Sequence, residues 1–235
     1  MIYFEKSLPA PPSLEIEKHK NNGTYLKADV ISQLKQDFKN KCYICENKAL
    51  ISINVEHLVS HREDIDKKFS WENLFLSCSH CNNIKLHHYD NILNCTMVED
   101  DIENSIKLKV DPYPKSSVEV TALKNDERVE KTVELLNKVY NGTTILKTEE
   151  AETIKKNLLK EILAFQSLLF EYDELEHDHE DDLEEINNIK KQISRHLRNS
   201  SAYTGFKRWI IKANESLTIE FGSLFLEQES DTKTI

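Results

Sequence analysis

Two Cys-x-x-Cys pairs constrain this chain more than any other feature. Cys42 and Cys45 form the first pair, Cys78 and Cys81 form the second, and 32 residues lie between the pairs. Two residues between thiolates let both reach one ion, and two such turns complete a tetrahedral four-thiolate zinc site. We therefore expect a structural zinc ion, with buried free cysteines as the alternative. Because such a site has no open coordination position, any chemistry must come from the residues between the pairs.

The composition is typical of a globular protein in a reducing compartment. The chain has 235 residues, of which 39% are apolar and 31% charged. It lacks the run of about 20 apolar residues that spans a bilayer, and its first residues lack the apolar core of a secretory signal. We expect a cytoplasmic protein with reduced thiols. The net charge of −10 argues against a broad basic surface for nucleic acid, but not against a local phosphate site.

The chain divides into three predicted parts, with boundaries at residues 24 and 117. Residues 1–24 are expected to form an irregular arm because they contain Pro9, Pro11 and Pro12. Residues 25–117 hold the cysteine segment, preceded by a helix over 28–40 and followed by a loop from about 89 to 117. Residues 118–235 show helical periodicity and are expected to dock a partner. Helices are predicted over residues 126–141, 148–176, 183–199 and 205–221.

The segment between the cysteine pairs predicts a compact ββα unit. Ile51, Ile53 and Val55 alternate as in a strand, which ends on Glu56 and His57. The stretch "WENLFLSCSHC" adds Asn73 and a short apolar run. The stretch "HCNNIK" then starts a helix that carries Asn82 and Lys85. The predicted fold class is α+β and mostly α, with a zinc-stapled ββα unit and a helical C-terminal part.

Residues 41–90 resemble the HNH endonucleases, the ββα-metal fold. The shared order is Cys-x-x-Cys, an acidic residue and His, Trp-x-Asn-Leu, then Cys-x-x-Cys-Asn-x-x-Lys. Within that family, the sequence "VEH…WENLFLSCSHCNNIK" is most similar to the nucleases of Septu-type and retron-associated anti-phage systems. This resemblance implies a nuclease subunit that acts beside an ATPase related to the SMC and ABC families.

The resemblance also implies a role for each polar residue of the unit. His57 would be the general base that takes a proton from the attacking water. Glu56 and Asn82 would be ligands of a catalytic Mg²⁺ or Mn²⁺. Asn73 would hydrogen-bond across the loop and hold His57 in place, and Lys85 would contact a phosphate. Each role has a structural alternative: His57 could be a packed core histidine, and Asn82 a helix cap. Asn73 could be an ordinary turn residue, and Lys85 a solvated lysine on the helix surface.

Charge limits how such a unit could hold its substrate. Residues 41–90 contain six Lys or Arg and seven Asp or Glu, a net of −1, so they gain little from counterion release. The nucleic acid would have to be bound by basic patches at residues 190–199 and 206–209, or by a partner. The acidic stretch 171–185 is either a solvated helix junction, or an interaction surface or second metal site using His177 and His179.

Three functions remain open from the sequence. The first is a metal-dependent nuclease, acting on DNA and directed by a partner. The second is the same chemistry on RNA or tRNA, because water attack assisted by a divalent cation works on either backbone. The third is a zinc-clipped module that binds nucleic acid or protein without catalysis.

Overall fold

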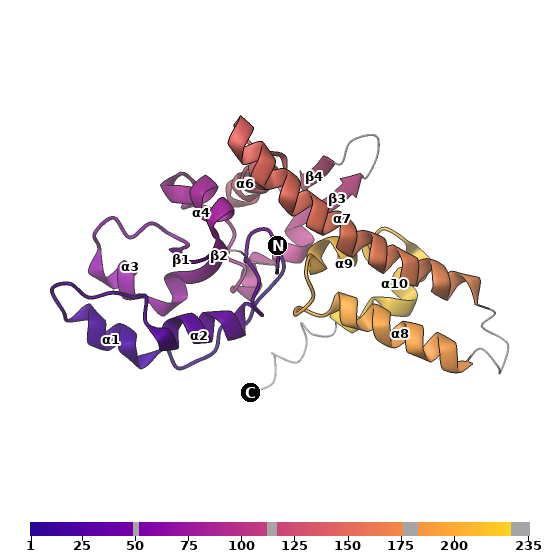
Figure 1. Cartoon of the computed structure of the whole chain (residues 1–235), viewed down its shortest axis with the longest axis horizontal. Coiled ribbons are helices and arrows are strands. Elements are labelled where there is room, and N and C mark those ends of the chain that lie inside the picture. Colours follow the sequence, from indigo (N-terminus) through magenta and orange to yellow (C-terminus); the bar gives the residue numbers. More distant parts are fainter. Residues whose placement is uncertain (49–51, 112–116, 176–182, 227–235) are drawn as a thin grey trace.

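The computed structural model describes residues 1–48, 52–111, 117–175 and 183–226 (Figure 1). Its elements, in chain order, are α1 (Pro12–Lys18), α2 (Ala28–Asp37), β1 (Ile53–His57), α3 (Ile65–Phe69), η1 (Trp71–Asn73), β2 (Leu74–Cys78), α4 (Ser79–Lys85), η2 (Leu86–Tyr89), η3 (Val98–Asp100), α5 (Ile102–Ser105), β3 (Ile106–Asp111), β4 (Ser117–Ala122), α6 (Glu127–Asn141), α7 (Ile145–Glu174), α8 (Leu183–Leu197), α9 (Thr204–Lys212), α10 (Glu215–Phe221) and α11 (Ser223–Leu226). The η elements are single 3₁₀ turns. The mostly helical α+β class is confirmed.

The first hairpin and α4 form the expected ββα unit. Strand β1 pairs antiparallel with β2, so that Ile53 lies opposite Cys78 and His57 opposite Leu74. Every residue of β2 is buried, because α2 and α4 pack against this strand. Ile51, which was expected in the first strand, lies outside the described residues.

The expectation of an irregular N-terminal arm is wrong for residues 12–18. Helix α1 has Pro12 at its first position, where a missing N–H costs nothing and the fixed φ suits a helix. The segment before it is also packed: Met1, Ile2 and Phe4 are buried, and the Phe4 amide donates to the Cys95 carbonyl at 2.8 Å.

The expectation of a loop from residue 89 to 117 is also wrong, because this segment contains α5 and strand β3. Strand β3 pairs antiparallel with β4, with Ile106 opposite Ala122 and Asp111 opposite Ser117. Ile106 and Leu108 are buried, whereas the lysines between and after them are exposed. This alternation marks a half-buried strand and was present in the sequence.

The helical C-terminal part is confirmed, with changes at the helix ends. Helix α7 begins three residues earlier than expected, because Thr144, rather than Thr148, caps it by accepting from the Lys147 amide at 3.3 Å. The helix expected over 205–221 is two helices. Asn214 lies between them and caps α10 by accepting from the Leu217 amide at 3.2 Å.

Two hydrophobic clusters hold these elements together. The larger includes residues of the N-terminal segment, the ββα unit, the second hairpin and α6, together with parts of α7 and α9. It therefore has members on both sides of residue 117, and the predicted domain boundary there stays a prediction. The smaller cluster lies between the second half of α7 and α8, α9, α10 and α11.

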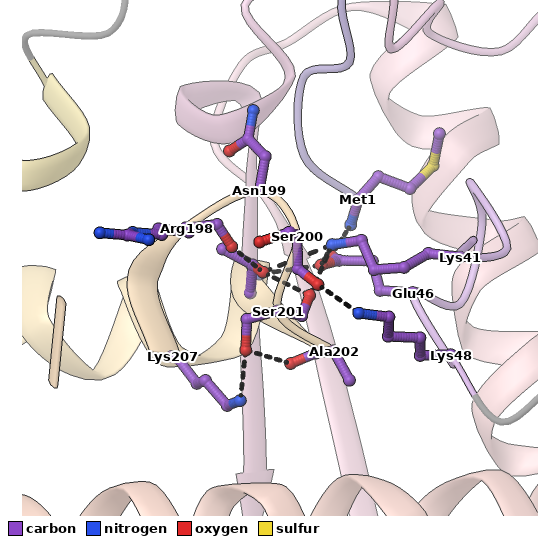
Figure 2. Close-up of polar contacts among 12 residues, drawn as sticks. Met1, Lys41, Glu46, Lys48, Arg198, Asn199, Ser200, Ser201, Ala202 and Lys207 are labelled. Carbon is purple, nitrogen blue, oxygen red and sulfur yellow. Dashed lines mark hydrogen bonds and ion pairs between the residues drawn. The ribbon is translucent and has the colours of Figure 1, made fainter. Parts of the chain in front are cut away.

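A polar cluster joins the first cysteine turn to the segment before α9 (Figure 2). The Lys41 ammonium donates to the Ser201 carbonyl at 2.7 Å, and Lys48 donates to the Ser200 carbonyl at 3.1 Å. Glu46 is fully buried between Lys41 and the Met1 ammonium and accepts from the Gly205 amide at 3.1 Å. A Cβ on Gly205 would lie 2.6 Å from the Glu46 carboxylate, so a larger residue here would force this buried carboxylate to shift.

The basic patch expected at residues 206–209 is wrong, because its charges point inward. Lys207 is buried and pairs with Glu161 at 2.7 Å. Arg208 is buried and pairs with Glu103 at 2.7 Å, and it also donates to the Leu197 carbonyl and to Asn199. In the patch expected at 190–199, Lys190 pairs with Glu220 at 2.5 Å, while Arg195 and Arg198 are exposed.

The acidic stretch falls partly outside the described residues. His177 and His179, which were considered as ligands of a second metal, belong to the undescribed segment 176–182. No helix in the described part of the chain is long and apolar enough to cross a membrane.

We expect Arg208→Ala to destabilise the fold by about 3–5 kcal/mol, because it leaves the Glu103 carboxylate largely buried and without its partner. Arg195→Ala, which removes an exposed arginine, should change stability by less than about 0.5 kcal/mol. Urea unfolding of both variants measures the difference. Equal stabilities would contradict the buried placement of Arg208.

Candidate zinc centre and active site

The four cysteines of the two pairs come together at one point. Their sulfur atoms all lie within 4.8 Å of one another, and the four side chains are buried. The Cys45 and Cys78 sulfurs are 3.9 Å apart. Zinc–sulfur bonds of about 2.3 Å in a tetrahedron place sulfurs roughly 3.8 Å apart, so this donor set fits Zn²⁺. The cluster could therefore hold a structural zinc ion.

His80 lies between the second pair of cysteines but is used elsewhere. Its Nε2 lies 2.8 Å from the Val139 carbonyl, and its Nδ1 lies 2.6 Å from the Glu150 carboxylate. Because both nitrogens face acceptors of α6 and α7, His80 is not a zinc ligand in this arrangement. It instead ties the cysteine cluster to the helical half of the chain. Tyr140 of α6 adds a second tie by donating to the Cys45 carbonyl at 2.9 Å.

We expect the purified chain to contain one zinc ion, and Cys45→Ser to lose most of it, because three sulfurs no longer close the tetrahedron. Cys95→Ser is the matched control, since Cys95 is equally buried but lies outside the cluster. Elemental analysis by mass spectrometry, with urea unfolding in parallel, measures both. Full zinc in the Cys45 variant would contradict the assignment.

His57 is the last residue of β1 and is about half-buried. Its Nε2 lies 3.0 Å from the Lys68 carbonyl, which can only accept, so Nε2 carries the proton. Nδ1 of the neutral ring is then left with a lone pair, and it has no hydrogen bond within the described residues. Burial lowers the pKa of His57 below its usual value, which keeps the ring neutral. The ring edges of Tyr25 and His61 lie against it, with centroids 4.7 and 4.8 Å away.

Asn73 ties together the loop that follows His57. Its Oδ1 accepts from the Val59 amide at 2.8 Å, and its Nδ2 donates to the carbonyls of Val59 at 2.8 Å and Lys67 at 3.1 Å. The Asn73 carbonyl also accepts from the Leu58 amide at 3.0 Å. Lys67 is the neighbour of Lys68, whose carbonyl holds the His57 ring. The geometry is therefore compatible with the expected role of Asn73 in orienting His57.

Glu56 and Lys85 form a buried pair on the other face of β1. Lys85 is 1% exposed, and its ammonium lies 3.2 Å from the Glu56 carboxylate and 2.9 Å from the His57 carbonyl. Tyr43 also donates to Glu56. This placement does not fit the expected phosphate contact of Lys85, because its charge is paired with Glu56 inside the protein. Burial raises the pKa of Glu56, and a metal ion at Glu56 would have to compete with Lys85.

Asn82 lies on α4, one helical turn before Lys85 and therefore on the same side of the helix. It is half-exposed, and its side chain makes no hydrogen bond within the described residues. Successive strand residues face opposite ways, so Glu56 faces α4 and His57 faces Tyr25 and His61. The structure thus groups Glu56 with Lys85, and His57 with the loop held by Asn73.

Sequence reasoning missed one residue that packs against His57 and one that holds the loop after it. Asp90 accepts from the amide of Ser60 at 2.9 Å and from its hydroxyl at 2.7 Å, which fixes the loop on its far side. Tyr25 belongs to the N-terminal segment, and burial raises its pKa. Neither residue stands in a recognisable pattern, because the contacts form between segments about 30 residues apart.

We expect Lys85→Met to lower stability by about 3–5 kcal/mol, because it leaves Glu56 buried without its partner. Adding Glu56→Gln should restore part of this loss. Lys67→Met, which removes an exposed lysine of the same unit, is the control and should be nearly neutral. If Lys85→Met instead unfolds like wild type, the buried pair is not a structural element.

Comparison with known protein families identifies the segment that holds these residues. The family model of the HNH endonucleases matches residues 42–88, which run from the first cysteine through α4. Neither the curated proteins nor the solved structures gave a match. The matched segment holds the four-cysteine cluster, the hairpin and His57. Residues 42–88 of this chain therefore form an HNH endonuclease domain.

Proposed function

We propose that this chain is an endonuclease that hydrolyses phosphodiester bonds of nucleic acid, with DNA as the favoured substrate. The observation that carries the proposal is the state of His57 within the HNH domain. One ring nitrogen is held by the Lys68 carbonyl and the other has no hydrogen bond within the described residues. A nitrogen in this state can accept a proton.

His57 would act through Nδ1. A water molecule that hydrogen-bonds to Nδ1 would lose its proton to the ring as its oxygen attacks phosphorus. The Lys68 carbonyl would then stabilise the imidazolium through Nε2–H. Asn73 would keep the carbonyl of Lys67 and the backbone of Val59 in place, so that the ring keeps its direction.

Asn82 and Glu56 would hold a divalent cation on the α4 side of β1. Their oxygen atoms suit Mg²⁺ or Mn²⁺, which would neutralise charge on the phosphate and on the leaving oxygen. Asn82 already presents a half-exposed amide. Glu56 would have to exchange its contact with Lys85 for the cation.

Delivery by a partner is the finer part of the proposal. The near-neutral HNH segment and the inward-facing Lys207 and Arg208 leave little basic surface for bare nucleic acid. The resemblance to Septu-type and retron-associated nucleases suggests an ATPase related to the SMC and ABC families as that partner. It also suggests a cytoplasmic role in anti-phage defence.

We expect the zinc-loaded chain to cleave plasmid DNA with Mg²⁺ or Mn²⁺, and His57→Ala to cleave about 10²–10⁴-fold more slowly, as for loss of a general base. His87→Ala is the matched control, because His87 is an exposed histidine of the same unit. Both variants are first checked for zinc and for wild-type unfolding. Gel assays on plasmid DNA and on total RNA measure cleavage.

The outcomes separate the three functions. Cleavage of RNA alone that is lost with His57 keeps the chemistry and changes the substrate. Cleavage that is equal in wild type and in His57→Ala would contradict the role of His57. If neither protein cleaves, with or without the candidate ATPase, a binding module explains the chain better.

A further inference from the structure

A groove of about 310 Å³ lies between the second hairpin and the helical half of the chain, and no described residue of the HNH segment lines it. Residues 107–110 of β3 form one wall. Helix α7 contributes Leu159, Ile162, Leu163 and Gln166, and α9 with the residue that caps its end contributes Phe206, Trp209, Ile210 and Ala213. In Figure 1, β3 lies beside α7 and α9. Both helices thus present positions i, i+3, i+4 and i+7, which is one continuous helix face each.

The β3 wall of the groove is the edge of the strand. Side chains of a strand alternate between two faces, yet four consecutive residues of β3 line this groove. A cavity on one face would be lined by every second residue only. The groove therefore runs along the hydrogen-bonding edge of β3 that points away from β4.

The free hydrogen-bonding groups on this edge can be assigned. The Leu123 amide donates to the Ser105 carbonyl at 2.9 Å, just beyond the ladder. Opposing pairs in an antiparallel ladder alternate between bonded and non-bonded. Lys107 and Lys109 are thus bonded to β4, and the N–H and C=O groups of Ile106, Leu108 and Val110 point into the groove.

Two contacts support this assignment. Trp209 Nε1 donates to the Ile106 carbonyl at 2.9 Å from the groove side. On the outer edge of β4, the Asn141 side chain accepts from the Val118 amide at 3.4 Å and donates to its carbonyl at 3.0 Å. Val118 lies opposite Val110, so that pair is non-bonded as required. One edge of the hairpin is thus capped, whereas Leu108 and Val110 have no such cap within the described residues.

The lining of the groove selects a kind of occupant. Its helix walls are largely apolar, and Leu163 is 58% exposed. Its charged lining residues are Lys107 and Lys109. Lys109 already pairs with Asp111 at 3.0 Å, whereas Lys107 has no ion pair within the described residues. An extended backbone would satisfy Leu108 and Val110, apolar side chains would fill the floor, and a carboxylate would complement Lys107.

We propose that the groove binds an extended segment of another protein, which adds as a strand to the free edge of β3. The segment carries apolar residues at alternate positions and acidic residues between them. This inference does not depend on the proposed nuclease activity, because it uses no residue of the HNH domain. Lys107 on β3 also hinders pairing between copies of the chain, which favours an acidic partner.

The test uses two phage-displayed libraries of ten-residue peptides that alternate apolar and charged residues. One library carries Asp and Glu at the charged positions and the other carries Lys and Arg. The full chain is the bait. Fluorescent copies of enriched peptides are then titrated against wild type, Leu163→Asp, Lys107→Glu and Ile219→Asp. Ile219 is the matched control, since it is 80% exposed on α10 and does not line the groove.

We expect enrichment from the acidic library alone. Leu163→Asp and Lys107→Glu should weaken binding at least tenfold, and Ile219→Asp should leave it unchanged. Hydrogen exchange should show that bound peptide protects the amides of Leu108 and Val110, which exchange rapidly in the free chain. No enrichment, enrichment from the basic library, or binding insensitive to Leu163→Asp would overturn the proposal.

Two further outcomes assign the groove to another occupant and also overturn the proposal. If the free chain is a dimer that Leu163→Asp dissociates, the occupant is a second copy. If the Leu108 and Val110 amides are protected in the free chain and deletion of residues 227–235 exposes them, the occupant is the chain's own C-terminal segment.

Discussion

The convergence of four cysteine sulfurs is the constraint on which the remaining structure depends. Cys42 and Cys45 lie in a turn before β1, and Cys78 and Cys81 lie where β2 passes into α4. A zinc ion there would join both ends of the hairpin and the start of the helix. The segments around the cluster are tied outward by Lys41, Glu46 and His80, which bind the helical half of the chain. The cysteine cluster is therefore the region where the ββα unit is both stabilised and attached to the helical half of the chain.

Because side chains alternate along a strand, Glu56 and His57 of β1 lie on opposite faces and have different surroundings. Glu56 faces α4 and is neutralised in a buried pair with Lys85, which also holds the carbonyl of His57. His57 faces the opposite way, where the Lys68 carbonyl of α3 fixes its tautomer and the loop before α3 is tied by Asn73 and Asp90. The buried pair therefore fixes the backbone position of the histidine, and the Lys68 carbonyl fixes its ring.

Patterns local in the sequence predicted well, and patterns that depend on distant partners did not. The doubled Cys-x-x-Cys spacing indicated the cluster, and the apolar alternation together with "HCNNIK" indicated the ββα unit. The buried state of Lys85, Lys207 and Arg208 could not be predicted, because their partners Glu56, Glu161 and Glu103 lie far away along the chain. The strand "IKLKVD" was missed although its alternation is clear, because flanking prolines and polar residues favoured a loop.

The central proposal is that His57 acts together with a cation held by Asn82, although the side chains of Glu56 and His57 face opposite sides of β1. The most direct measurement is a Mn²⁺ titration of the zinc-loaded chain, with the ring signals of His57 followed by NMR. The account predicts one bound Mn²⁺ that broadens these signals, and loss of the broadening in Asn82→Ala but not in Asn83→Ala, whose side chain is exposed. Mn²⁺ that binds without affecting His57, or that binds equally well without Asn82, would contradict it.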